Sequence, residues 1–174
     1  MKLMMILKIF QETSYVKDAA CQTAPCECEA KGNGFGPFEG QSIYIGSQET
    51  MDVFKAIDDA WSARDYELLK TFLIDGGTYS FADGTTVTNG DDFVSYIDGE
   101  YQEAMESGAE WGWTIDYAFP VYAAGSDDPD ATNQNGEWIN AQFTSAEGRY
   151  VEWYMIVDGK LSYFNQAKAT IPAE

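Results

Sequence analysis

The sequence predicts an α+β fold in which three N-terminal helices precede a mostly antiparallel sheet, with a flexible arm ahead of them. Three observations carry this prediction. Apolar residues recur every three to four positions between residues 47 and 107, as on the buried side of a helix. From Glu110 onward the apolar period changes to two, which is typical of strands. Near the C-terminus, Asp158-Gly159 separates two apolar runs and indicates a β-hairpin.

The three helices are predicted from capping residues and apolar stripes. Ser47 or Thr50 begins the first helix, Asp65 the second and Asn89 the third, and Gly76-Gly77 ends the second. Short extended pieces are expected at residues 78–81 and 86–88. The predicted buried sides of the helices are apolar and comprise Val53, Phe54, Ile57, Ala60, Trp61, Leu68, Leu69, Phe72, Phe93, Ile97 and Tyr101.

The strands follow in a meander. A long strand should run from Glu110 towards Tyr122, because large apolar residues at odd positions alternate there with smaller or polar ones. A polar connection over residues 125–136 leads to a strand at 138–145, and a turn at 146–148 leads into the final hairpin.

The Asp158-Gly159 turn predicts the register of that hairpin. A two-residue type I′ turn places Ile156 opposite Leu161 and, two residues further on each strand, Tyr154 opposite Tyr163. Since side chains alternate between the faces of a strand, one face of the hairpin should carry a continuous set of side chains. This set is Tyr150, Glu152, Tyr154, Ile156, Leu161, Tyr163 and Asn165.

The chain is expected to divide into an N-terminal arm and linker at 1–48, mostly irregular, a domain at 49–170 and a tail at 171–174. The apolar run at residues 1–10 is too short to span a bilayer and is a poor secretory signal, which favours the cytoplasm over export or lipid anchoring. Three thiols lie in the arm and could bind a soft metal or form a disulfide, but without histidine they are an incomplete zinc set. They are Cys21, Cys26 and Cys28.

The composition excludes several kinds of function. With 29 Asp and Glu against 10 Lys and Arg, the chain repels phosphates and anionic lipids, so neither nucleic acid nor a membrane is expected as a partner. The same charge also suits a heavily solvated surface. The chain has no histidine, which removes Ser-His-Asp and Cys-His nucleophiles and His-ligated metals. No cofactor and no bound metal are predicted.

Three short segments carry a resemblance to a known family. They are AWSARD at residues 60–65, NGDDF at 89–93 and WYMIVDGKL at 153–161. In this order and spacing they resemble the nuclear transport factor 2-like superfamily, especially its SnoaL-like branch of polyketide cyclases and ketosteroid isomerases. The resemblance covers about residues 49–170. It implies a curved sheet wrapped around the helices as a cone-like α+β barrel with an apolar interior, often in a homodimer formed through the outer sheet face.

The resemblance implies no single activity, because this fold hosts isomerases, dehydratases, cyclases, hydrolases and non-catalytic binders. In an ungapped comparison from Asp65, the general-base position of the isomerases falls on Phe81, and their carbonyl-polarising tyrosine falls near Ile57. The isomerase pattern is therefore not retained. The sequence favours a small-molecule-binding or accessory domain with an apolar cone-shaped pocket and without histidine-based catalysis.

An enzyme of isomerase, dehydratase or cyclase type is the alternative. A carboxylate, Glu152 or Asp116, would exchange the proton while Tyr154 or Tyr163 donates to a developing oxyanion. Such an enzyme requires a buried carboxylate within about 3 Å of a tyrosine hydroxyl or of a bound ligand. The competing interpretation is an ordinary cross-strand set, in which the tyrosines pack together and Glu152 bonds Asn165.

Aromatic side chains are the candidate ligand contacts. The residues expected to line the pocket are Trp61, Phe81, Trp113, Tyr117, Phe143, Tyr154, Tyr163 and Asn165. They would stack on a small apolar or aromatic molecule, or simply fill a core and a dimer face. A third hypothesis is a dimeric interaction module without an open pocket, against which a cavity of about 300 Å³ or more would argue. Asp127-Asp128-Pro129-Asp130 suits a solvated turn better than a calcium loop.

Overall fold

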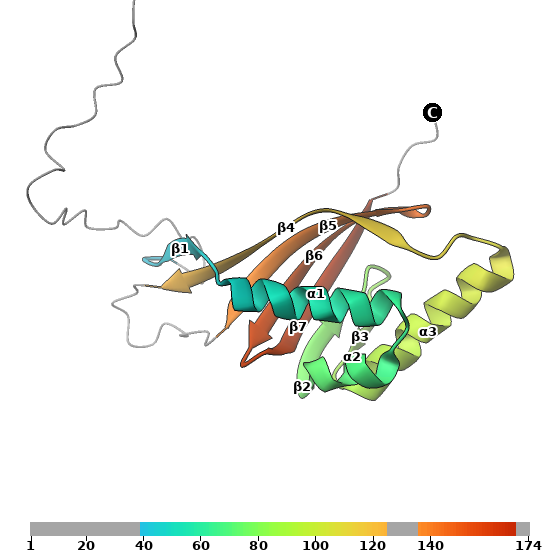
Figure 1. The fold of residues 1–174 in the computed structure, drawn as a ribbon, viewed down its shortest axis with the longest axis horizontal. Helices are drawn as coiled ribbons and strands as arrows, with labels where there is room; N and C mark the ends of the chain where they lie inside the picture. Colours follow the sequence, from blue (N-terminus) through green and yellow to red (C-terminus); the bar gives the residue numbers. More distant parts are fainter. Residues whose placement is uncertain (1–38, 125–135, 170–174) are drawn as a thin grey trace, which may run out of the picture. The chain divides into compact units, whose positions relative to one another are not determined.

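The computed structural model describes residues 39–124 and 136–169, which form three helices and one seven-stranded sheet (Figure 1). The predicted α+β class is confirmed. The elements in chain order are β1 Ser42–Ile45, α1 Gln48–Ser62, α2 Tyr66–Phe72, β2 Leu73–Ser80, β3 Thr86–Val87, α3 Gly90–Ser107, β4 Trp113–Ala124, β5 Glu137–Ser145, β6 Gly148–Val157 and β7 Lys160–Ala169.

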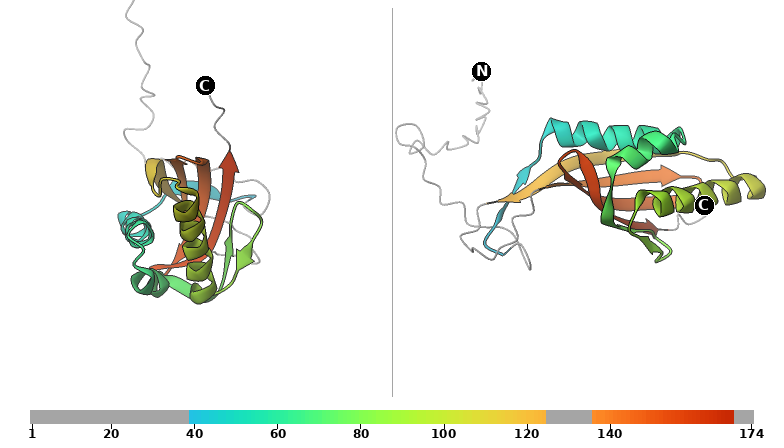
Figure 2. Two further views of the ribbon diagram at one scale, coloured as in Figure 1. Left: turned by 90° about the vertical axis from the view of Figure 1, so that its right-hand side faces the viewer. Right: turned by 90° about the horizontal axis from the view of Figure 1, so that it is seen from below.

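The sheet is curved and mostly antiparallel, as predicted, but it does not close. Its strand order is β1-β4-β5-β6-β7-β2-β3, so β1 and β3 are the two edges. Only the pair β2 and β7 is parallel. Helix α1 packs on β4, β5 and β6, and α3 packs on β2, so that both helices cover the same, inner face (Figures 1 and 2). None of the described helices is long and apolar enough to cross a membrane.

The three predicted helix starts are confirmed by their caps. Ser47 Oγ accepts a hydrogen bond from the backbone N–H of Thr50 at 3.1 Å, and Asp65 Oδ1 caps α2 in the same way. Asn89 Oδ1 accepts from Asp92 N at 2.8 Å at the start of α3. These contacts satisfy backbone donors that a helix leaves unpaired at its first turn.

Two predicted boundaries are wrong. Helix α2 ends at Phe72 rather than at Gly76-Gly77, because strand β2 already begins at Leu73 and these glycines lie within it. Residues 42–45, expected to belong to the linker, form β1 and pair antiparallel with β4, so the sheet extends upstream of residue 49. The predictions for Cys21, Cys26, Cys28 and for the polar segment 127–130 lie outside the described residues.

An aromatic cluster fills the space between the helices and the sheet. Phe54 of α1 packs against Tyr154 of β6 at 5.1 Å between ring centroids. Phe93 of α3 lies 5.3 Å from Tyr79 and 5.9 Å from Phe164, and all three side chains are fully buried. Large rings packed edge to face on both helices and on three strands therefore hold the inner face together.

The final hairpin contains a β-bulge that the sequence did not predict. The turn is as expected, with φ of +50° at Asp158 and +74° at Gly159, and Ile156 pairs with Leu161. The next pair is Met155 with Tyr163, so Ser162 is an extra residue on β7. Beyond it the register is shifted by one, because a bulge sets two residues of one strand against one of the other.

The bulge corrects two predictions about the hairpin faces. Tyr154 lies opposite Phe164, and Glu152 lies opposite Gln166, instead of opposite Tyr163 and Asn165. Tyr163 and Asn165 are therefore on the outer face, away from Glu152 and Tyr154. The prediction that Ile156 and Leu161 point inward is confirmed, since both are buried.

A second irregularity lies in β4. Ile115 pairs with Phe143, but the next pair is Tyr117 with Gln142, which makes Asp116 an extra residue. Tyr117 is consequently on the outer face, where its ring stacks on that of Phe119 at 5.9 Å. Trp113, which precedes the bulge, stays on the inner face.

Candidate functional site

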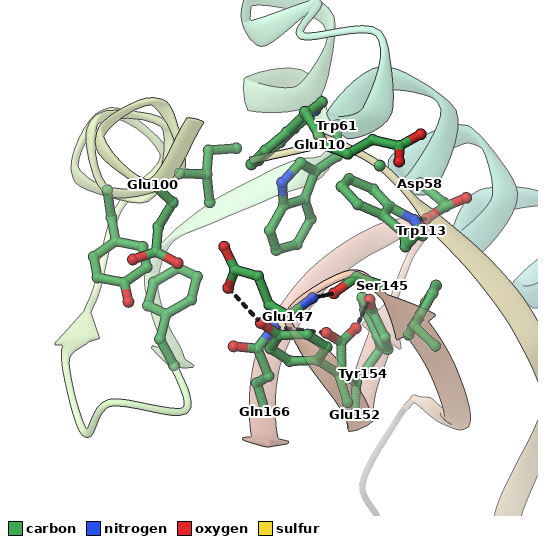
Figure 3. Close-up of a pocket in the computed structure, with 17 residues that line it drawn as sticks. Asp58, Trp61, Glu100, Glu110, Trp113, Ser145, Glu147, Glu152, Tyr154 and Gln166 are labelled. Carbon is green, nitrogen blue, oxygen red and sulfur yellow. Dashed lines mark hydrogen bonds between the residues drawn. The ribbon is translucent and has the colours of Figure 1, made fainter. Parts of the chain in front are cut away.

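A pocket opens on the inner face between α1, α3 and the strands β5, β6 and β7, with a cavity volume of about 100 Å³ (Figure 3). Its walls combine aromatic rings with carboxyl groups. The aromatic residues that line it are Trp61, Phe81, Tyr96, Trp111, Trp113, Phe143, Tyr150 and Tyr154. The acidic ones are Asp58, Glu100, Glu110, Glu147 and Glu152.

Glu152 of β6 lies at the floor of this pocket and is 5% exposed. The Tyr154 hydroxyl donates a short hydrogen bond to its Oε2, and Gln166 Nε2 donates to its Oε1 at 2.7 Å. Burial raises the pKa of Glu152 to about 7; the negative charge of Asp58 adds to this, and the two hydrogen bonds oppose it. Near neutral pH, Glu152 can therefore both accept and release a proton.

Tyr154 is the hydrogen-bond donor of this pair. Its side chain is 2% exposed, and burial raises its pKa well above the ordinary value of 10.0, with a further contribution from the negative charge of Glu152. Tyr154 is therefore protonated near neutral pH. Its single hydroxyl proton is engaged by Glu152, so a protonated Glu152 and Tyr154 together can offer a ligand one further donor.

Asp58 of α1 is the second carboxyl near the floor. Trp113 Nε1 donates a hydrogen bond to its Oδ1 at 2.8 Å, which fixes the indole against the helix. Burial raises the pKa of Asp58, and the charge of Asp59 acts in the same direction, while the Trp113 bond opposes both. Figure 3 shows Asp58 and Trp113 across the pocket from Glu152.

The rim contains an ion pair and a further carboxyl. Lys168 Nζ lies 2.8 Å from Glu147 Oε2 and 5.2 Å from the ring centroid of Tyr150. The hydrogen bond from Lys168 lowers the pKa of Glu147. Glu100 of α3 behaves oppositely: burial raises its pKa, and the charges of Glu147 and other nearby carboxylates raise it further.

The aromatic walls interlock through tilted and edge-on contacts. Trp61 lies 6.0 Å from Trp113 and 5.8 Å from Phe164, and Trp111 lies 5.6 Å from Trp113. The Nε1 atoms of Trp61 and Trp111 are buried without a hydrogen-bond partner among the described residues. Both indoles line the pocket, so an acceptor atom of a ligand could satisfy one of them.

The structure brings six of the predicted site residues together and separates four. The six that line the pocket are Trp61, Phe81, Trp113, Phe143, Glu152 and Tyr154. The four on the outer face are Asp116, Tyr117, Tyr163 and Asn165. For these four the predicted role in the site is contradicted by their place in the sheet. The two bulges turn Tyr117, Tyr163 and Asn165 to the outer face, whereas Asp116 is outer by its alternation with Trp113 and Ile115.

The outer residues have their own partners. Tyr163 packs against Trp138 at 5.4 Å, and Asp116 accepts hydrogen bonds of 2.8 Å from both Gln142 and Thr144. The latter bonds lower the pKa of Asp116, and the positive charge of Arg149 acts in the same direction. Asp116 therefore remains ionised and faces away from the pocket.

Several residues of the site were missed by reasoning from the sequence. Asp58 precedes Trp61 by three residues on α1, so its helical position beside the apolar stripe was an available signal. Gln166 required knowledge of the bulge at Ser162 and gave no signal of its own. No cluster of three or more Cys, Asp or Glu side chains within residues 39–124 and 136–169 is arranged to hold a metal ion.

The outer face carries a half-exposed apolar surface. Its members from β1, β4 and β6 are between 38% and 74% exposed, and they are Ile43, Ile45, Tyr117, Phe119 and Trp153. Contiguous exposed apolar patches on a sheet are typical of protein–protein contacts. We call these five residues the outer patch.

Comparison with solved structures identifies the fold. A SnoaL-like protein of unknown function from Burkholderia thailandensis E264 aligns with a TM-score of 0.53 and 12% identity, covering 72% of this chain and 99% of that one. A cystatin-like fold protein from Burkholderia xenovorans LB400 aligns with a TM-score of 0.51 and 8% identity, covering 76% and 100%.

The chain thus has the NTF2-like fold of SnoaL-like proteins, which confirms the resemblance predicted from the sequence at the level of the fold. No family model matches the sequence, and no curated protein matches it. At these identities the likeness concerns the fold alone, and function has to be argued from the site.

Proposed function

We propose that this chain is a small-molecule-binding domain that takes its ligand into the inner-face pocket. The observation that carries the proposal is the pocket itself, in which aromatic walls surround a floor of Glu152, Tyr154 and Gln166. Apolar walls with a few convergent polar groups are typical of ligand sites. The cavity of about 100 Å³ is smaller than the roughly 150 Å³ that holds benzene in an engineered cavity, so a small molecule, or a small group of a larger one, fits.

The five tryptophans allow a direct test by NMR of the indole N–H groups. Three of them, Trp61, Trp111 and Trp113, line the pocket, whereas Trp138 and Trp153 do not. As a neutral probe we choose cyclohexanone, whose carbonyl end can enter the cavity while the rest of the ring lies in the opening. We expect saturable shifts of the three pocket signals. Shifts that grow linearly, or that affect all five signals alike, would contradict the proposal.

A matched pair of substitutions on β5 supplies the control. Ser145 lines the pocket, whereas its neighbour Thr144 points to the outer face. Ser145→Tyr should fill the opening and abolish the saturable shifts. Thr144→Tyr should leave them in place, because its side chain lies on the other side of the sheet.

Proton transfer by Glu152 is the second candidate function, and a specific contact favours it. The buried carboxyl has a pKa of about 7 and is hydrogen-bonded to a tyrosine hydroxyl, the arrangement that the enzyme hypothesis requires. In D₂O we expect the protein to accelerate exchange of the α-protons of cyclohexanone in a saturable way. Glu152→Gln should reduce this rate by about 10²-fold or more, and Asp116→Asn should not change it. If wild type gives no acceleration, the domain binds without this chemistry.

Self-association through the outer patch is a separate proposal. A pocket of this size is below the roughly 300 Å³ typical of ligand sites, so the interaction module remains a candidate in its own right. Exposed rings such as Phe119 and Trp153 on a continuous sheet face support a homodimer. Light scattering should give twice the mass of 19.3 kDa, falling to one chain in Phe119→Glu with Trp153→Glu. A wild-type monomer at all concentrations would refute it.

A further inference from the structure

We infer that the ligand of the inner-face pocket is a small organic cation, with the alkylated ammonium head of an amine held between carboxylates and aromatic rings. The inference rests on the proposed binding function and adds the chemical class of the ligand. Its three supports are the charge of the walls, the faces of the rings and the size of the cavity.

The first support is an excess of negative charge in the pocket. Five lining residues are acidic, and none of the described lining residues is Lys or Arg. Of the five, only Glu147 forms an ion pair within the described part of the chain, with Lys168. Asp58, Glu110 and Glu152 thus bring carboxyl groups to a partly enclosed site without an ion-pair partner among the described residues. Glu100 has only the charge of Lys168, which already pairs with Glu147.

This arrangement costs free energy in the empty protein. Burial and the neighbouring carboxylates raise the pKa of Asp58, Glu100 and Glu152, which means that the ionised forms are disfavoured where they stand. A cation placed among them would be attracted by each ionised carboxylate and would relieve their mutual repulsion. An anionic ligand would add to the repulsion, and a neutral one would leave it unchanged.

The second support is the aromatic wall. The faces of indole and phenol rings carry negative potential and attract cations, most strongly where water is excluded. Two rings of this region already take cations from the chain itself: Arg64 Cζ lies 3.9 Å above Tyr101, and Lys168 Nζ lies 5.2 Å from Tyr150. Tyr101 packs edge-on against Trp111 of the pocket at 5.2 Å. The indole faces of the pocket offer the same interaction to a ligand.

The third support is size and coordination. A cavity of about 100 Å³ suits a compact head such as trimethylammonium, with the rest of the ligand towards the opening. A metal ion would require several oxygen atoms converging on one point, whereas the described acidic side chains form no such cluster. A methylated ammonium needs no convergent ligands, because its charge is spread over its surface.

Choline and 3,3-dimethylbutan-1-ol test the inference. The two molecules have the same shape, but choline has a positively charged nitrogen where the alcohol has a neutral carbon. We expect choline to shift the indole signals of Trp61, Trp111 and Trp113 and to bind at least about tenfold tighter than the alcohol. Sodium chloride at matching concentrations controls for ionic strength. If the alcohol binds as tightly, or if sodium chloride reproduces the shifts, the cation inference is overturned while the binding function stands. If neither compound binds, the cation inference is also overturned. The cyclohexanone titration then tests the binding function independently.

Charge removal inside the pocket provides the second arm. The double variant Asp58→Asn with Glu100→Gln removes two carboxyl groups from the pocket. The asparagine at position 58 keeps an oxygen that can accept the hydrogen bond from Trp113 Nε1. The matched control is Glu49→Gln with Glu106→Gln, two exposed helix positions outside the pocket. We expect about a tenfold loss of choline affinity in the pocket variant and less than about twofold in the control. Equal losses in both variants, or none in the pocket variant, would overturn the inference.

Discussion

The two faces of the sheet are built from the same kinds of residue and yet have opposite chemistry. Each face carries tryptophan and tyrosine side chains and at least one carboxylate, and along β6 successive side chains point to opposite faces. Glu152 on the inner face is buried, and its pKa is raised to about 7. Asp116 on the outer face is fully exposed, accepts two hydrogen bonds, and has a lowered pKa. The position of a carboxyl group relative to water, rather than its presence, therefore decides whether it can exchange a proton near neutral pH.

The aromatic residues show the same contrast. Tyr154 is 2% exposed and lies among Phe54 and Phe164, whereas its neighbour Trp153 is 38% exposed and belongs to the outer patch. The inner rings form a core with a pocket at one end. The outer rings form a surface that suits another protein chain.

The largest expected effect is a difference in the free energy of unfolding between alanine variants of two adjacent residues of β7. Phe164→Ala should lower the free energy of unfolding by about 3–5 kcal/mol, because a fully buried ring in contact with Trp61, Phe93 and Tyr154 is removed. Tyr163→Ala should cost about 1 kcal/mol, since that ring is only half-buried on the outer face. Urea denaturation measures both variants. The reverse order would mean that β7 has no bulge at Ser162.

The next effect compares the pH dependence of the two carboxyls. The folded-state pKa of Glu152 is raised from 4.5 to about 7, so its favourable contribution is complete below 4.5 and is lost as pH rises through 7. Relative to Glu152→Gln, wild type should therefore lose up to about 3 kcal/mol of unfolding free energy between pH 4.5 and 8. Urea denaturation across this pH range gives the difference.

Asp116→Asn is the control, and its sign is opposite. Because the folded-state pKa of Asp116 lies below the ordinary 3.8, its stabilisation is present above that pH and is lost as pH falls through the folded-state value. Wild type and Asp116→Asn should thus keep a constant difference between pH 5 and 8. A difference that changes in this range for Asp116, or stays constant for Glu152, would contradict the assignment of the two faces.

The smallest effect concerns the hydrogen bond between Tyr154 and Glu152. This bond lowers the pKa of Glu152 and so opposes the effect of burial. Tyr154→Phe should therefore raise the pKa of Glu152 by about 1, as measured by ¹³C NMR of the side-chain carboxyl. Tyr163→Phe should leave it unchanged. Equal shifts in the two variants would indicate that Tyr154 and Tyr163 share one face after all.

Most of the fold followed from local signals in the sequence. Ser47, Asp65 and Asn89 mark helix starts because a side-chain oxygen next to an apolar stripe caps free N–H groups. Asp158-Gly159 marks the hairpin because few residue pairs adopt two positive φ angles. Both signals depend on a few neighbouring residues and need no knowledge of the tertiary structure.

The bulges could not be predicted in this way. Neither Ser162 nor Asp116 carries a local signal for a bulge, and each becomes an extra residue through the packing of the whole sheet. Because of one unpredicted extra residue in β7, Phe164 and Gln166 lie on the inner face, where Tyr163 and Asn165 were predicted. Glu152 and Tyr154 were assigned to the correct face because they lie on β6, which has no extra residue. Strand β1 was missed since four residues next to a glycine-rich segment give little periodicity.

The central claim is that burial at the pocket floor makes Glu152 a carboxyl that titrates near neutral pH. Its most direct test is a pH titration of the Glu152 side-chain carboxyl by ¹³C NMR, with the signal assigned by its absence in Glu152→Gln. The structure predicts a midpoint of about 7. A midpoint near 4.5, the ordinary value for glutamate, would show that this carboxyl is solvated and would contradict the account of the pocket.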